Sequence, residues 1–249
     1  MDVLLFLNAL LLSRLVYVFQ DQPLRTPGLI LLGIIQAMLC LIVFSFGWPA
    51  LSLAILSVLV LLLSERWLSD NWMNETRFLG FVVVLLAAVV LRDSLSLAPW
   101  TESVLLQSMH TLGFAAGTVN LPAPGLWFVF GFLIVANETN LLIRSLFHRF
   151  HLEPRTPANN AGTDQGGQID QQEYNAGRVI GILERWLIYS VLMVSQNFNV
   201  IALIMAAKGF ARFRQMEERA FAEYVLIGTL SSILLTVLVA QIISGLSGG

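Results

Sequence analysis

Residues 28–46 read GLILLGIIQAMLCLIVFSF and contain no charged side chain. A second run, AEYVLIGTLSSILLTVLVAQII at residues 222–243, contains one charged side chain. In a helix, about 20 apolar residues cross the ~30 Å hydrocarbon layer of a bilayer. Because a helix satisfies its own backbone hydrogen bonds in lipid, both runs predict transmembrane helices.

The rest of the chain repeats this pattern. Further apolar runs cover residues 4–19, 50–63, 78–91, 125–142, 179–194 and 200–207. They predict an all-α fold, a polytopic helical membrane protein with about seven or eight transmembrane helices. No segment is suited to form a soluble domain of its own, so residues 1–249 are interpreted as a single multi-pass domain.

Composition supports the same class and excludes others. Apolar residues make up 57% of the chain and charged residues 12%, about half the charged share of a soluble domain. The net charge of −2 gives no sign of a nucleic-acid partner. The one cysteine, Cys40, lies inside an apolar run, so no intrachain disulfide is predicted. His148 and His151 are spaced i, i+3, but without a third ligand they predict no metal site, and no cofactor is expected.

The first apolar run leaves one alternative open. Arg14 lies inside residues 4–19, and no small-residue cleavage site follows, so the run is interpreted as a retained helix and not as a signal peptide. The long side chain of Arg14 is expected to reach toward the interface near Phe19. Whether the run spans the membrane or lies in the interface stays open.

Basic residues are concentrated in one set of loops. With eight crossings, eleven of the fourteen basic residues fall on the same side: Arg25, Arg66, Arg77, Arg144, Arg149, Arg155, Arg178, Lys208, Arg212, Arg214 and Arg219. Such a bias predicts that this side faces the cytoplasm and that both termini face outward. Residues 104–121 are apolar, but a further crossing there would place the basic residues between Arg144 and Arg178 on the outer side of the membrane. We therefore expect an outer surface helix or a re-entrant segment.

Residues 152–176 are rich in Pro, Asn, Gln, Gly and Asp and contain almost no large apolar side chain. Such a segment buries too little surface to fold alone. We expect a mobile cytoplasmic loop.

Charged residues inside or beside the apolar runs form the candidate site. Placed on helices, they fall at a similar depth near the cytoplasmic side: Glu138, Asn140, Glu184, Arg185, Lys208, Arg212 and Glu223. A charge in lipid is costly, so these groups should face inward and pair. We expect Glu184 to pair with Lys208 or Arg185. The layer is interpreted either as a ligand-binding site or as a structural ion-pair network.

The expected ligand class follows from the charge balance around that layer. Near the cytoplasmic boundary the basic residues Arg178, Arg185, Lys208, Arg212 and Arg214 outnumber the three glutamates, which favours an anionic small molecule or a lipid head group over a cation. Membrane lipids are expected partners in any case. A homo-oligomer or a partner subunit is left open.

The last third of the chain resembles a family of membrane proteins. The residues concerned are GRVIGILER at 177–185, AAK at 206–208, Arg212-Phe213 and AEYVLIGTL at 222–230. Residues 177–230 resemble the carboxy-terminal part of a family of uncharacterised bacterial and phage integral membrane proteins. The resemblance implies a bacterial inner membrane and names no reaction.

Three function classes fit these observations. They are a non-enzymatic anion-binding or transport protein, a structural or signalling subunit acting through a partner, and an intramembrane enzyme acting on lipid head groups. No nucleophile elbow, phosphate loop or zinc-binding pattern is present in the sequence, and no catalytic residue is assigned. Binding or transport is therefore preferred.

Overall fold

The computed structural model describes residues 2–66, 72–111, 123–150, 171–211, 213, 217 and 219–248. Within these residues every regular element is a helix, apart from one isolated antiparallel bridge between Phe44 and Leu97. Five helices are long and apolar enough to cross a membrane. The predicted fold class, a helical multi-pass membrane protein, is confirmed at that level. The finer count of seven or eight crossings stays a prediction.

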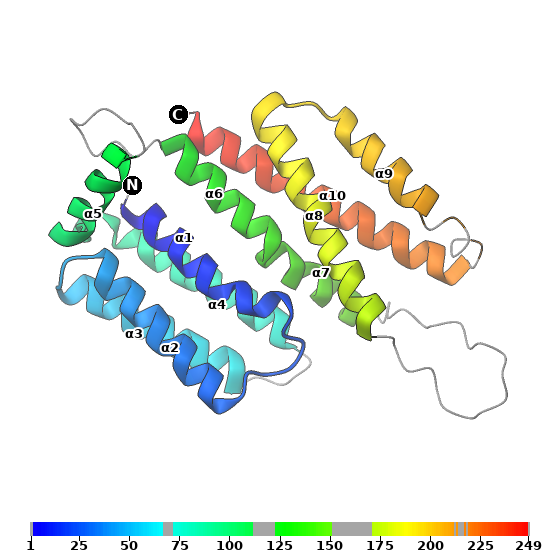
Figure 1. Ribbon diagram of the computed structural model, residues 1–249. Coiled ribbons are helices and arrows are strands. Elements are labelled where there is room, and N and C mark those ends of the chain that lie inside the picture. Colours follow the sequence, from blue (N-terminus) through cyan, green and yellow to red (C-terminus); the bar gives the residue numbers. More distant parts are fainter. Residues whose placement is uncertain are drawn as a thin grey trace.

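The first half of the chain forms the N-terminal sector (Figure 1). Its elements are α1 (Asp2–Arg14), η1 (Leu15–Val18), α2 (Thr26–Val43), α3 (Trp48–Arg66) and α4 (Met73–Val90). Helix α2 has a proline in its first turn, where the missing N–H costs no hydrogen bond. The helices α2, α3 and α4 pack as consecutive antiparallel neighbours.

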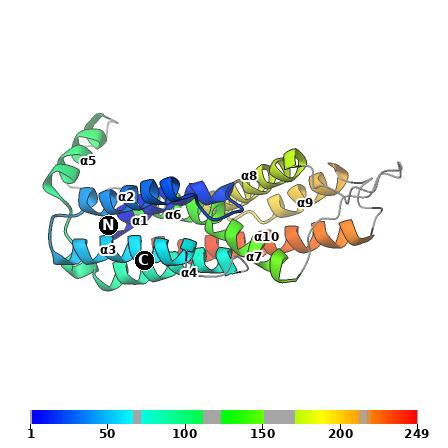
Figure 2. The same cartoon turned by 90° about the horizontal axis from the view of Figure 1, so that it is seen from below.

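The connections at one end of this sector are short. The bridge between Phe44 and Leu97 is supported by a 2.8 Å hydrogen bond from the Ser45 N–H to the Ser96 carbonyl. Helices η3 (Arg92–Ser94) and α5 (Pro99–Thr111) follow at the same end, and Figure 2 shows α5 projecting away from the bundle. Part of the predicted 104–121 segment is thus helical, and residues 112–121 lie outside the described residues.

The second half forms the C-terminal sector. Its helices are α6 (Ala123–Ala136), α7 (Glu138–Arg149), α8 (Gln171–Ser195), α9 (Asn199–Ala211) and α10 (Arg219–Ser247). Only Asn137 separates α6 from α7, so together they cover the predicted 125–142 run. Helix α10 packs against α6 and α8, whereas α9 contacts mainly α8.

The predicted loop at 152–176 needs one correction. Residues 152–170 lie outside the described residues, but residues 171–176 form the first turns of α8. The Gln-Gln-Glu start is polar yet made of good helix formers, so it extends the helix beyond the apolar run.

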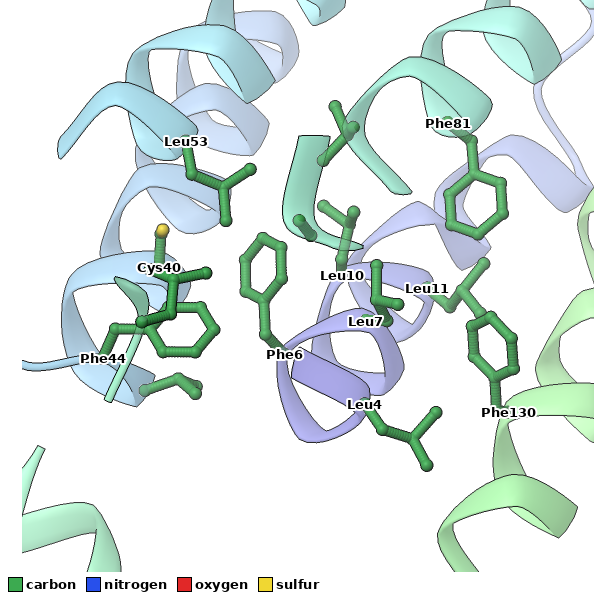
Figure 3. Packing of buried hydrophobic residues seen from close by; sticks show 14 of the residues in the cluster. Leu4, Phe6, Leu7, Leu10, Leu11, Cys40, Phe44, Leu53, Phe81 and Phe130 are labelled. Carbon is green, nitrogen blue, oxygen red and sulfur yellow. The ribbon is translucent and has the colours of Figure 1, made fainter. Parts of the chain in front are cut away.

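Helix α1 of the N-terminal sector also packs against α6 of the C-terminal sector and lies at the centre of the core. Figure 3 shows Phe6 beside Cys40 and Phe44 of α2, while Leu11 lies near Phe81 of α4 and Phe130 of α6. The side chains of Phe6 and Leu11 are completely buried. Packing on both faces is not the arrangement of a helix lying flat on a membrane surface, which buries one face only.

Candidate functional site

One end of the bundle collects the buried charges. At this end α1 and η1 stop, α3 ends, α4 starts, and α7 and α8 approach the α1–α2 connection (Figure 1). We name the first group the Arg14–Arg77 cluster, which consists of Arg14, Tyr17, Glu65, Arg77 and Glu138.

Arg14 forms a buried ion pair with Glu138 across the two sectors. Its Nε and Nη2 donate to the two carboxylate oxygens at 2.8 and 3.2 Å, and Nη2 also donates to the Arg77 carbonyl at 2.7 Å. The expectation that Arg14 reaches toward the interface is therefore wrong. Two hydrogen bonds to a buried carboxylate offset the free-energy cost of removing the guanidinium from water. The side chain therefore does not need to reach the water at the interface.

The second pair in this cluster joins α3 to α4. Arg77 Nε and Nη2 donate to Glu65 at 2.6 and 3.0 Å, and both side chains are fully buried. Arg77 also donates to the carbonyls of Gln20 and Gln22. The Tyr17 ring lies between the two guanidinium groups, at 5.2 Å from Arg14 and 4.4 Å from Arg77, within the range of cation–π contacts.

Asp21 closes the outer edge of this cluster. Its carboxylate accepts from Arg144 at 2.5 Å and from Arg178 at 2.7 Å, and is partly exposed. The same two arginines donate to the carbonyls of Tyr17 and Val18, which end the first helical segment. Side-chain donors thus satisfy carbonyls that a helix end leaves without partners.

A second group of charges lies in the C-terminal sector, and we name it the Arg185 cluster. It consists of Glu184 and Arg185 on α8, Lys208 on α9, and Thr229 and Ser232 on α10. Lys208 Nζ donates to Glu184 at 2.8 Å, which confirms the prediction that Glu184 pairs with a base on another helix. The two side chains are 20% and 18% exposed, so this pair is only partly shielded from its surroundings.

Arg185 is buried and makes no ion pair with a carboxylate in the part of the chain that the structure describes. Its Nε donates to the Val135 carbonyl at 2.8 Å, and Nη1 makes a long 3.4 Å contact with the Ser232 hydroxyl. Its Nη2 makes no hydrogen bond with any described residue, and the same is true of the Thr229 hydroxyl. The two residues are 4% and 6% exposed. A buried donor without a partner costs about 1–3 kcal/mol, and more when it is charged.

The neighbouring contacts of α8 hold Arg185 in position. Trp186 Nε1 donates to the Phe132 carbonyl at 3.1 Å, and the Tyr189 hydroxyl donates to the Phe128 carbonyl at 3.1 Å. The Trp186 indole stacks on the Phe132 ring. A methyl group on Gly131 would overlap the Tyr189 ring, so glycine is required for this close approach. These contacts fix the rotation of α8 against α6.

The structure describes six of the seven predicted site residues and distributes them over different groups of contacts. Glu138 and Asn140 belong to the first group: Glu138 pairs with Arg14, and the Asn140 amide lies 3.5 Å from the Val18 carbonyl. Glu184, Arg185 and Lys208 come together as expected. Glu223 is exposed and accepts from Arg219 on its own helix at 2.8 Å. Arg212 lies outside the described residues.

Sequence reasoning missed most of the Arg14–Arg77 cluster. Glu65 and Arg77 stand next to polar loop residues and were indistinguishable from solvated helix ends such as Arg66, which is exposed. The available signal was one acidic and one basic residue on either side of a short connection, which is common at any helix end. Among the described residues, no group of three or more metal-ligating side chains is present.

No family model matches the chain, and no curated protein or solved structure shows significant similarity to it. The resemblance of residues 177–230 to bacterial and phage membrane proteins stays a prediction.

Proposed function

We propose that this chain is a non-enzymatic protein of the bacterial inner membrane that binds or transports an anion at the Arg185 cluster. The observation that carries the proposal is the buried Arg185 guanidinium, which has no carboxylate partner and one nitrogen without a hydrogen bond. Lys208 already pairs with Glu184, and the three charged groups Glu184, Arg185 and Lys208 together carry a net charge of about +1. An anion would neutralise that charge.

The Arg14–Arg77 cluster supports a structural role by contrast. Its two guanidinium groups are matched by two carboxylates, each at hydrogen-bond distance. The pairs connect α1 with α7 and α3 with α4, so they join helices and leave no net charge for a ligand. Buried pairs of this kind can specify which helices pack together.

We further propose one multi-pass domain with eight crossings, the basic end in the cytoplasm and both termini outside. With η1, helix α1 spans about 27 Å, and α8 spans about 37 Å, so both approach or exceed the ~30 Å layer. Exposed aromatic side chains occur at both ends, as interfacial belts do: Phe19, Trp72, Phe150 and Phe210 at the basic end, and Phe46, Trp48, Trp100 and Phe198 at the other.

Cysteine labelling tests the orientation. A cysteine at Gly166 should resist an impermeant thiol reagent in intact cells and react after lysis, whereas a cysteine at Ser94 should react in intact cells. The wild type supplies the background, because its single cysteine, Cys40, is buried. Labelling at Gly166 in intact cells would reverse the orientation.

Anion-dependent stability tests the binding function. Purified protein should gain about 3–6 °C in Tm at an anion concentration ten times Kd, because a ligand stabilises the state that binds it. The anions to compare are chloride and inorganic phosphate in detergent, and phosphatidylglycerol against phosphatidylcholine in nanodiscs. The inorganic anions in detergent test for binding of a free anion, and the comparison of the two lipids tests for binding of a head group.

Arg185→Gln should abolish the gain, whereas Arg219→Gln, an exposed arginine on α10, should keep it. Both variants must first elute as single species in size-exclusion chromatography, so that misfolding is separated from lost binding. Equal gains in wild type and Arg185→Gln would remove Arg185 from any site. The structural or signalling subunit would then be the better hypothesis.

A further inference from the structure

The hydrogen-bond donors of the Arg185 cluster that have no partner among the described residues lie on two helices in contact, α8 and α10. Arg185 Nη1 contacts the Ser232 hydroxyl, and Thr229 precedes Ser232 by three residues on α10. Residues three apart on a helix lie on the same face, with Cβ atoms about 5–6 Å apart. The unsatisfied Thr229 hydroxyl therefore lies one turn from the residue that the guanidinium touches.

Three described carboxylates on the helices around Arg185 pair with other residues. Glu138 on α7 accepts from Arg14, Glu184 on α8 accepts from Lys208, and Glu223 on α10 accepts from Arg219. None of these three makes an ion pair with Arg185, although Glu184 is close enough to act on it electrostatically. A single buried charge is costly in a low-dielectric interior, and a counter-ion is the direct way to reduce that cost.

We propose that Arg185, Thr229 and Ser232 bind a small monovalent inorganic anion, for which chloride is the natural probe. The inference rests on the proposed anion-binding function and names the ligand class. The guanidinium Nη2 and the Thr229 hydroxyl donate, and the Ser232 hydroxyl is a third donor. The two unsatisfied atoms have almost no exposed surface, so a phosphate or a head group does not fit beside them, and an anion of one atom must displace the Arg185 and Thr229 side chains slightly to bind.

The selectivity of this site depends on the neutral hydroxyl groups of Thr229 and Ser232 and on the one charge of Arg185. Helix α8 is held against α6 by Trp186 and Tyr189, so the guanidinium cannot easily turn toward water. Lys208 lies on the neighbouring helix and stays paired with Glu184. The anion would therefore depend on Arg185 and Thr229, and not on the general positive charge of this end of the bundle.

The test is Tm in detergent with sodium chloride against sodium gluconate at equal ionic strength, over a range of chloride concentrations. Wild type should show a saturable, chloride-specific rise, which bromide should reproduce. Thr229→Val should raise the apparent Kd by at least about tenfold, because it removes a hydrogen bond to a charged partner. The matched control is Thr236→Val, which removes an equally buried α10 hydroxyl that donates to the Ser232 carbonyl.

An anomalous bromide peak between Arg185 and Thr229 in crystals would locate the anion directly. Equal chloride dependence in wild type and Thr229→Val would overturn the site, and so would the absence of any chloride-specific rise. If phosphate or phosphatidylglycerol still stabilises the protein through Arg185, the proposed function stands and only the ligand class fails. If no anion acts through Arg185, both fail.

Discussion

The two sectors treat buried arginine differently. In the Arg14–Arg77 cluster each guanidinium meets a carboxylate and at least one backbone carbonyl, so the charge is compensated, although the buried Tyr17 hydroxyl makes no hydrogen bond with any described residue. In the Arg185 cluster the guanidinium meets one carbonyl and one distant hydroxyl. The position of each arginine relative to the apolar runs of the sequence does not distinguish the two cases. The difference lies in the partners, and it separates a group that holds helices together from one that can hold a ligand.

The largest effect is expected from a variant that breaks an ion pair of the Arg14–Arg77 cluster. Glu65→Ala should lower the free energy of unfolding by about 3–5 kcal/mol, because it leaves the fully buried Arg77 without its carboxylate. Reversible unfolding in mixed micelles, followed by circular dichroism, measures the change.

The double variant Glu65→Leu with Arg77→Met should recover most of that loss, since well-packed apolar residues can replace a buried ion pair. Asp93→Ala is the control: its pair with Arg92 is exposed, and no measurable change is expected. A Glu65→Ala variant as stable as wild type would show that Arg77 is not buried as the structure has it.

Smaller effects are expected from two adjacent residues in the Arg185 cluster. Glu184→Ala should cost about 1–2 kcal/mol, between the values for exposed and fully buried pairs, because its pair with Lys208 is partly exposed. Arg185→Met, measured in gluconate without chloride, should change stability by less than about 1 kcal/mol, because it removes a charge that no carboxylate compensates.

A double-mutant cycle sharpens this contrast. Lys208→Ala should reduce the effect of Glu184→Ala, since the two groups interact, whereas purely additive losses would contradict the pair seen at 2.8 Å. A loss of several kcal/mol in Arg185→Met under the same conditions would instead place Arg185 among the structural residues.

Much of the fold could be predicted because lipid imposes a simple constraint. The runs at 28–46 and 222–243 became α2 and α10, since an uncharged stretch of that length has few alternatives to a helix. The pairing of Glu184 with Lys208 was predictable for a related reason: both stand beside apolar residues, and burying one alone is costly. The wrong prediction was Arg14, whose partner Glu138 is 124 residues away.

The sequence by itself determined that this chain forms apolar helices of membrane-spanning length, because hydrophobicity and helix length are local properties. It also placed basic residues at one end of those helices. Only the tertiary structure decided which charge meets which. Ion pairing depends on the rotation of each helix about its axis and on neighbours far apart in the chain, and neither leaves a local pattern. Arg14, Arg77 and Arg185 are the same residue type near similar boundaries, and only their contacts show that the first two pair with carboxylates while the third has no such partner among the described residues.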